Sequence, residues 1–144
     1  MIRVVLVALA LTAITVVIHG FGAVSAAQWS TRLWAQRRGR ARGLTAELIL
    51  AKLVGTLLVL HLAEAVVWGL CFLLMGALPD LETAAYFSLT SYTTVGYGDV
   101  VLRAPWRLLG PLEAAVGVLM LGWSTGVLVA VIGTIYRDLF RGNA

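Results

Sequence analysis

The residues best suited to chemistry stand in one short run. The run consists of Thr94, Val95, Gly96, Tyr97, Gly98 and Asp99. Glycines on both sides of the tyrosine accept backbone conformations that a residue with a Cβ atom resists. Such a backbone can turn successive carbonyl oxygens to one side, and four copies around one axis would form stacked rings of oxygens. These rings could replace the water shell of a cation, and the Thr94 hydroxyl could add a ring at the inner end.

This run resembles the selectivity filter of the potassium-channel pore family. The matching residues are Thr93, Thr94, Val95, Gly96, Tyr97, Gly98 and Asp99. The resemblance implies that four chains form a homotetramer, that K+ binds to the carbonyl oxygens of residues 94–97, and that Gly98 and Asp99 form the outer mouth. Tyr86 stands where the family often has an aromatic residue that braces Asp99. Neither an organic cofactor nor an enzymatic activity is implied.

Three apolar stretches can hold this run in a membrane. They cover residues 4–27, 48–77 and 108–136, and each exceeds the roughly 20 residues that cross a bilayer core. Hydrophobic residues make up 60% of the chain and charged residues 12%, against about 25% charged residues in a soluble domain. A shorter apolar stretch, residues 84–92, cannot span. Such a segment is allowed at membrane depth only where protein buries it or water reaches it.

The expected fold is an all-α integral membrane protein with three transmembrane helices. The resemblance implies a pore domain over residues 45–136, with an outer helix at 45–78, a re-entrant pore helix at 83–93, the filter at 94–98 and an inner helix at 108–136. An extra transmembrane helix at residues 1–27 and a basic cytoplasmic loop at 28–44 precede this domain. A short cytoplasmic tail at residues 137–144 follows it.

The basic residues predict the orientation. Eight of the eleven fall around the predicted loop and tail: Arg32, Arg37, Arg38, Arg40, Arg42, Lys52, Arg137 and Arg141. The positive-inside rule makes that side cytoplasmic, so the N-terminus and the filter are expected outside a plasma membrane. The loop arginines Arg32, Arg37, Arg38, Arg40 and Arg42 can attract anionic lipid headgroups. No nucleic-acid partner is expected.

Two competing interpretations concern the N-terminal part. The first apolar stretch resembles a secretory signal peptide with small residues near Ala26, but it is longer than a signal core and its removal would reverse the predicted orientation. We therefore expect a retained, peripheral helix. The arginine-rich loop resembles a voltage sensor in composition alone, because sensor arginines lie within a spanning helix and these lie in a polar connector.

The second predicted helix carries ionisable residues. Thr45 is expected to cap it, Glu47 to lie in its first turn, and Lys52 to extend toward the cytoplasm. His61 and Glu64 are three residues apart and so share a helix face. Two interpretations stay open for this pair: a proton-sensitive gating element behind the filter, or hydrogen bonds that hold the outer helix against the pore helix.

The third predicted helix should line the inner cavity. Pro111 suits its first turn. Glu113 is expected either to accept hydrogen bonds from the filter or pore helix, or to act at the helix N-terminus. Gly117 falls near the family's hinge position, and Gly122 is the rival hinge. Gly122 and Gly126 also have the spacing of a close helix contact.

The predicted function is passive, potassium-selective conduction through a homotetrameric pore. One alternative is a weakly selective cation channel with the same fold. Another is a non-conducting, channel-like membrane subunit that works through a partner. The intact residues 94–98 argue against the weakly selective channel. The short predicted tails, which offer little surface for a soluble partner, argue against the non-conducting subunit.

Overall fold

The computed structural model describes residues 1–37 and 42–141, and within them it has four helices. Three are long: α1 (Ile2–Gln36), α2 (Arg42–Leu74) and α4 (Leu109–Arg141). The fourth, α3 (Leu81–Tyr92), is short. All three long helices are apolar and long enough to cross a membrane. The predicted all-helical chain with three candidate spans is therefore confirmed.

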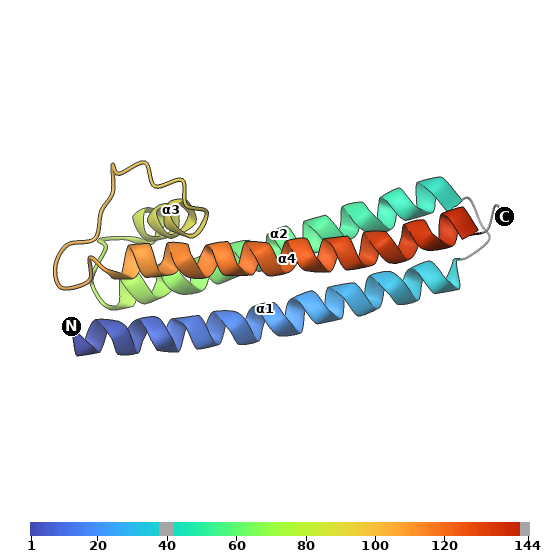
Figure 1. Cartoon of the computed structure of the whole chain (residues 1–144). Helices are drawn as coiled ribbons and strands as arrows, with labels where there is room; N and C mark the ends of the chain where they lie inside the picture. The colour runs from blue at the N-terminus through green and yellow to red at the C-terminus, as the bar shows by residue number, and fades with distance from the viewer. Residues whose placement is uncertain (38–41, 142–144) are drawn as a thin grey trace.

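The three long helices run up and down beside one another (Figure 1). The N-terminus lies at the end that carries α3, and α4 ends at the opposite end. Contacts between helices pair α1 with α2 and α4, and pair α3 with the same two helices. In the described part of the chain, α2 and α4 therefore separate α1 from α3.

Local hydrogen bonds define the turn between α2 and α3. Gly76 follows α2 with φ 64°, and the backbone N–H of Ala77 reaches back to the carbonyl oxygen of Phe72 at 2.9 Å. This left-handed residue satisfies carbonyls that the end of the helix leaves free. Asp80 then caps α3, because its side chain accepts a bond from the backbone N–H of Thr83 at 2.8 Å.

Several predicted boundaries on the basic side are corrected by the structure. Helix α1 continues to Gln36, so residues 28–36 are helical and not loop. This stretch contains neither glycine nor proline, and Trp34 Nε1 donates to Asp138 Oδ2 of α4 at 3.0 Å. Helix α2 begins at Arg42, so Thr45 does not cap it and Glu47 lies beyond its first turn.

The remaining boundaries shift by a few residues. Helix α2 ends at Leu74 and not near residue 78, because the Gly76 turn stops it. Helix α3 begins at Leu81 and not at residue 83, because Asp80 is its cap. Helix α4 includes Pro111 in its first turn, as predicted, and continues through the expected tail to Arg141. These shifts leave the order of elements unchanged.

Two buried apolar clusters hold the helices together. One surrounds α3 and includes Trp68, Phe72, Phe87 and Leu109. The other lies toward the opposite end and joins α1, α2 and α4. Many other large apolar side chains on the long helices remain exposed on the single chain. An apolar surface of this extent suits contact with lipid or with other protein chains.

Candidate functional site

The backbone of segment 93–99, which follows the C-terminal end of α3, alternates between left-handed and right-handed conformations. Thr94, Gly96 and Gly98 have φ values of 63°, 52° and 83°, while Val95 and Tyr97 keep negative φ. A backbone that alternates between the two hands gathers its N–H groups on one face. Its carbonyl oxygens then gather on the opposite face, as a wall of oxygens requires.

Hydrogen bonds to α3 hold the start of this segment. The backbone N–H of Thr94 donates to the Ser91 carbonyl at 2.9 Å, and that of Gly96 donates to the Thr90 carbonyl at 3.0 Å. Thr94 is the one described non-glycine residue with positive φ, a costly conformation that persists where the surroundings enforce it. Cβ atoms added to Gly96 or Gly98 would meet nothing within 4 Å, so glycine is required there for conformation and not for space.

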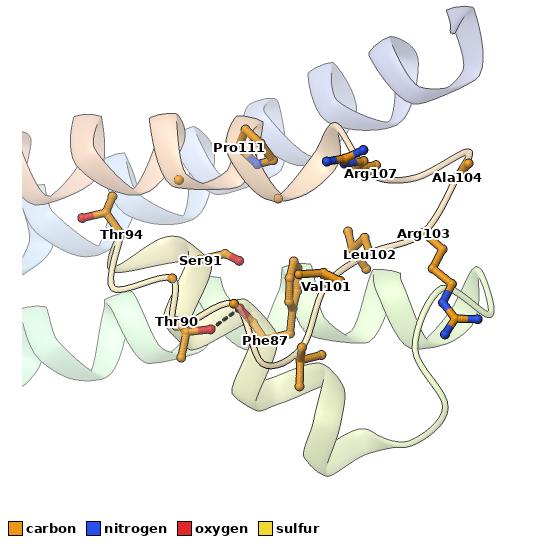
Figure 2. Close-up of a pocket in the computed structure, with 15 residues that line it drawn as sticks. Phe87, Thr90, Ser91, Thr94, Val101, Leu102, Arg103, Ala104, Arg107 and Pro111 are labelled. Atoms are coloured by element: carbon orange, nitrogen blue, oxygen red, sulfur yellow. Dashed lines mark hydrogen bonds between the residues drawn. The ribbon is translucent and has the colours of Figure 1, made fainter.

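The outer end of the segment is tied to α3 by side chains. The Tyr86 hydroxyl donates to Asp99 Oδ2 at 2.7 Å. This bond favours the ionised carboxylate and holds the pKa of Asp99 below its usual value. Thr90, one helical turn along α3, instead donates to the carbonyl oxygen of Phe87 at 3.0 Å (Figure 2).

A cavity of about 680 Å³ lies between α3, the segment 93–99, the loop that follows it and the start of α4. Figure 2 shows Thr94 and Ser91 at one end of this space and Arg103 at the other. All residues from Thr93 to Asp99 are exposed in the single chain. This segment therefore forms one open wall, and further protein would be needed to enclose an ion.

Gly117 of α4 lies directly against the end of α3. A Cβ atom at this position would stand 2.0 Å from the carbonyl oxygen of Tyr92. By contrast, Cβ atoms at Gly122 and Gly126 would meet nothing within 4 Å. Of the three glycines considered for bending or packing, Gly117 alone makes a close helix contact within the described chain.

Glu113 reaches α3, which is one of the two placements expected for this residue. The Ser88 hydroxyl of α3 contacts Glu113 Oε1 and also lies 2.5 Å from the carbonyl oxygen of Ala65 in α2. Both Ser88 and Glu113 are fully buried. These contacts join three helices behind the segment 93–99, whereas no hydrogen bond from that segment's backbone to Glu113 is present among the described residues.

Five side chains form a closed ring of contacts, which we call the five-residue ring: His19, Glu64, Tyr92, His61 and Ser124. His19 Nδ1 lies 2.9 Å from Glu64 Oε1, and the Tyr92 hydroxyl donates to Glu64 Oε2. His61 Nδ1 lies 3.0 Å from the Tyr92 oxygen, and His61 Nε2 lies 3.0 Å from Ser124 Oγ. Ser124 Oγ closes the ring at 3.3 Å from His19 Nε2. The ring takes members from all four helices.

This arrangement agrees with the hydrogen-bonding interpretation of His61 and Glu64, since both contact Tyr92 at the end of α3. Tyr92, Ser124 and Ser88 are not among the candidate residues predicted from the sequence. Nothing in the local sequence marks these residues, because their partners come from other helices. The contact between His19 and Glu64, which are 45 residues apart, could not be predicted from the sequence either.

The basic residues are described only in part. Lys52 Nζ lies 4.1 Å from the centre of the Trp29 ring, so its charge stays near the end of the bundle opposite α3. Arg32 and Arg37 are exposed at the same end. Arg38 and Arg40 lie outside the described residues, as does the side chain of Arg42.

Comparison with known proteins identifies the class of this chain. Residues 56–134 match a family model described as "Ion channel", which covers more than half of the chain. The matched region includes most of α2, all of α3, the segment 93–99 and most of α4. The chain therefore belongs to this ion-channel family, and the resemblance to the potassium-channel pore family is confirmed. No curated protein and no solved structure matches the chain.

Proposed function

We propose that the chain is one subunit of a homotetrameric, potassium-selective channel. The observation that carries this proposal is the alternating backbone of Thr94, Gly96 and Gly98. One chain supplies one wall of carbonyl oxygens, and four walls around an axis replace the hydration shell of K+. In this assembly the carbonyl oxygens of residues 94–97 and the Thr94 hydroxyl bind the ions.

The placement of α3 supports cation binding in the same region. The C-terminal end of a helix carries partial negative charge, and α3 ends at Tyr92, immediately before the filter segment. Four such ends directed toward one axis favour a cation at the inner end of the filter. In this role α3 is a re-entrant pore helix, α2 the outer helix and α4 the inner helix.

The exposed surface supports assembly from several copies. Tyr97 is 73% exposed and Val95 is 52% exposed in the single chain. In a homotetramer these side chains, pointing away from the ion path, pack against neighbouring copies. The cavity beside Thr94 and Arg107 is the space beside the filter that neighbouring protein would cover.

The charges at the two ends of the bundle support the proposed orientation. Lys52, Arg32 and Arg37 lie at the end opposite α3. The positive-inside rule then places that end in the cytoplasm and places the N-terminus and the filter outside the plasma membrane. In this orientation the basic residues would meet anionic headgroups of the cytoplasmic leaflet.

Ion flux from purified protein in liposomes tests the proposal. We expect a K+ gradient to drive flux and a Na+ gradient of the same size to drive little. Equal flux of both ions would instead favour the weakly selective channel. Absence of flux from a correctly assembled protein would favour the non-conducting subunit. Chemical cross-linking before electrophoresis checks the tetramer, because the proposal requires a ladder that ends at four chains.

A further inference from the structure

The five-residue ring has a definite proton requirement. Each contact between two electronegative atoms needs one proton, so the five contacts need five. Tyr92 and Ser124 bring one proton each, and each neutral imidazole brings one more. The fifth proton must then come from Glu64 or from a second proton on one histidine. The closed ring therefore has no net charge, either with all groups neutral or with Glu64 and one histidine ionised.

Removing or adding a proton breaks the ring at one contact. With four protons, Glu64 is ionised beside two neutral histidines, and two acceptors face each other somewhere in the ring. With six protons, two donors face each other. Both states also place a net charge among fully buried groups, since His19 and Glu64 have no exposed surface. All five contacts are thus satisfied only when the ring holds five protons.

The ring is also the side-chain connection between α1 and the end of α3. Helix α1 packs on α2 and α4, and His19 reaches Tyr92 through Glu64. The carbonyl oxygen of Tyr92 lies against Gly117, and the chain continues from Tyr92 into the segment 93–99. A broken ring would remove a side-chain anchor from the end of α3, at the point where that segment begins.

We propose that the five-residue ring is a buried proton-binding site that couples protonation to conduction. This inference rests on the proposed channel function. The closed ring holds Tyr92 in the position that supports a conducting filter, and either loss or gain of one proton lowers the open probability. His61, whose side chain is 11% exposed, is the member through which protons exchange with water.

The surroundings add one further ionisable group. That group is Glu113 of α4, whose contact is with Ser88 of α3. Helix α1 contributes His19, α2 contributes His61 and Glu64, and α3 contributes Tyr92.

A metal site is a less favoured interpretation of the same residues than a proton-binding site. Ligand atoms of His19, His61 and Glu64 lie within 4.8 Å of one another, close enough to share an ion. However, both nitrogens of each histidine and both oxygens of Glu64 already have hydrogen-bond partners. An ion would have to displace protons from a ring that is complete without it.

Single-channel recording across pH, with Glu64→Gln as the matched variant, tests the proposal. Glutamine donates one proton and accepts another, so it closes the ring with neutral histidines but cannot ionise. We expect a bell-shaped open probability for the wild type, with a fall of about ten-fold on each side, since a buried group loses its partner. Glu64→Gln should keep the acid limb and lose the alkaline limb.

Ser124→Ala removes two of the five contacts. Open probability should therefore be low at every pH and should change little on either the acid or the alkaline side. A wild type without pH dependence would overturn the proposal, as would a Glu64→Gln variant that keeps both limbs. Absence of K+ current from the wild type at every pH contradicts the channel proposal instead. A second measurement, which does not require current, distinguishes failure of the ring proposal from failure of the channel proposal.

That readout is the side-chain ¹⁵N NMR spectrum of the two histidines in lipid nanodiscs. The proposal requires that Glu64→Gln and Ser124→Ala both shift the signals of His19 and His61. Histidine spectra that respond to neither variant would overturn the ring even if no channel activity were found. If each chain instead bound one Zn²⁺ ion, and His19→Gln abolished this binding, the site would be a metal site and the proton proposal would be wrong.

Discussion

A Cβ atom on Gly117 would lie 2.0 Å from the carbonyl oxygen of Tyr92. No side chain fits there, so the backbone of α4 packs directly on the last residue of α3. The glycine at the expected hinge position therefore has a packing role that the sequence did not reveal. Bending of α4 is compatible with this contact, so Gly117→Ala would change both packing and bending.

We expect Gly117→Ala to destabilise the protein and to reduce K+/Na+ selectivity, because the end of α3 must move away from α4. Overpacking typically costs about 1–3 kcal/mol, and a clash with backbone belongs at the upper end. Thermal unfolding in detergent and the reversal potential in mixed K+ and Na+ measure the two effects. Gly122→Ala is the matched control, since its Cβ would meet nothing within 4 Å. Unchanged stability and selectivity in Gly117→Ala would show that the contact is dispensable.

Gly96→Ala should degrade selectivity by a different physical route. Its Cβ would have open space, but Gly96 has φ 52°, which alanine adopts at a cost of about 1–2 kcal/mol. We therefore expect a protein that still assembles but conducts Na+ nearly as well as K+. Gly43→Ala, with open space and no positive φ, is the control. A wild-type reversal potential in Gly96→Ala would show that residues 94–98 do not form the selectivity filter.

Tyr86→Phe should weaken the outer end of the filter segment in a pH-dependent way. The Tyr86 hydroxyl lowers the pKa of Asp99, so the stabilisation is complete above the ordinary value of about 3.9 and is lost as pH falls through the lowered value. At neutral pH the variant should inactivate faster, and the pKa of Asp99 should rise, as measured by NMR of its carboxyl carbon. Tyr136→Phe, at the other end of α4, should change neither property; an unaltered Asp99 titration in Tyr86→Phe would contradict the prediction.

The predictable and unpredictable parts of the site differ in how far apart their residues lie. Thr94 to Gly98 are contiguous, so the backbone conformation that they need can be predicted from the sequence. The five-residue ring joins partners between 28 and 105 residues apart, and only the packing of helices sets those distances. The His61–Glu64 pair showed that two ionisable groups share a face of α2, but not that His19 and Ser124 complete their bonds.

Helix boundaries show the same distinction. Asp80 ahead of α3 and Pro111 in α4 are local signals, and the structure uses both. The extension of α1 to Gln36 depends in addition on the bond from Trp34 to Asp138, 104 residues away. The sequence of this polar, arginine-containing stretch predicts a loop, because no local feature indicates that contact.

Glu113→Gln should be tolerated, whereas Glu113→Ala should not. The Ser88 hydroxyl has one proton but lies between two acceptors, Glu113 and the Ala65 carbonyl. Both contacts are satisfied only if Glu113 carries a proton, and glutamine supplies an equivalent donor. We expect Glu113→Gln within about 1 kcal/mol of wild type and Glu113→Ala to lose about 2 kcal/mol or more. Equal losses in the two variants would show that an ionised carboxylate is needed.

The last prediction concerns the orientation and retention of α1. In a Cys71→Ala background, which removes the chain's one cysteine, Ile2→Cys and Arg37→Cys place a thiol at each end of α1. Both positions are exposed, so reagent access reports the side of the membrane and not burial. A membrane-impermeant maleimide applied to intact cells should label Ile2→Cys and should label Arg37→Cys only after the membrane is opened. The reverse pattern would invert the proposed orientation. The intact mass of the extracted protein should also include α1, because His19, Thr15 and Trp34 hydrogen-bond to α2 or α4. A mature chain that lacks residues 1–26 would show that these contacts are not part of the working protein.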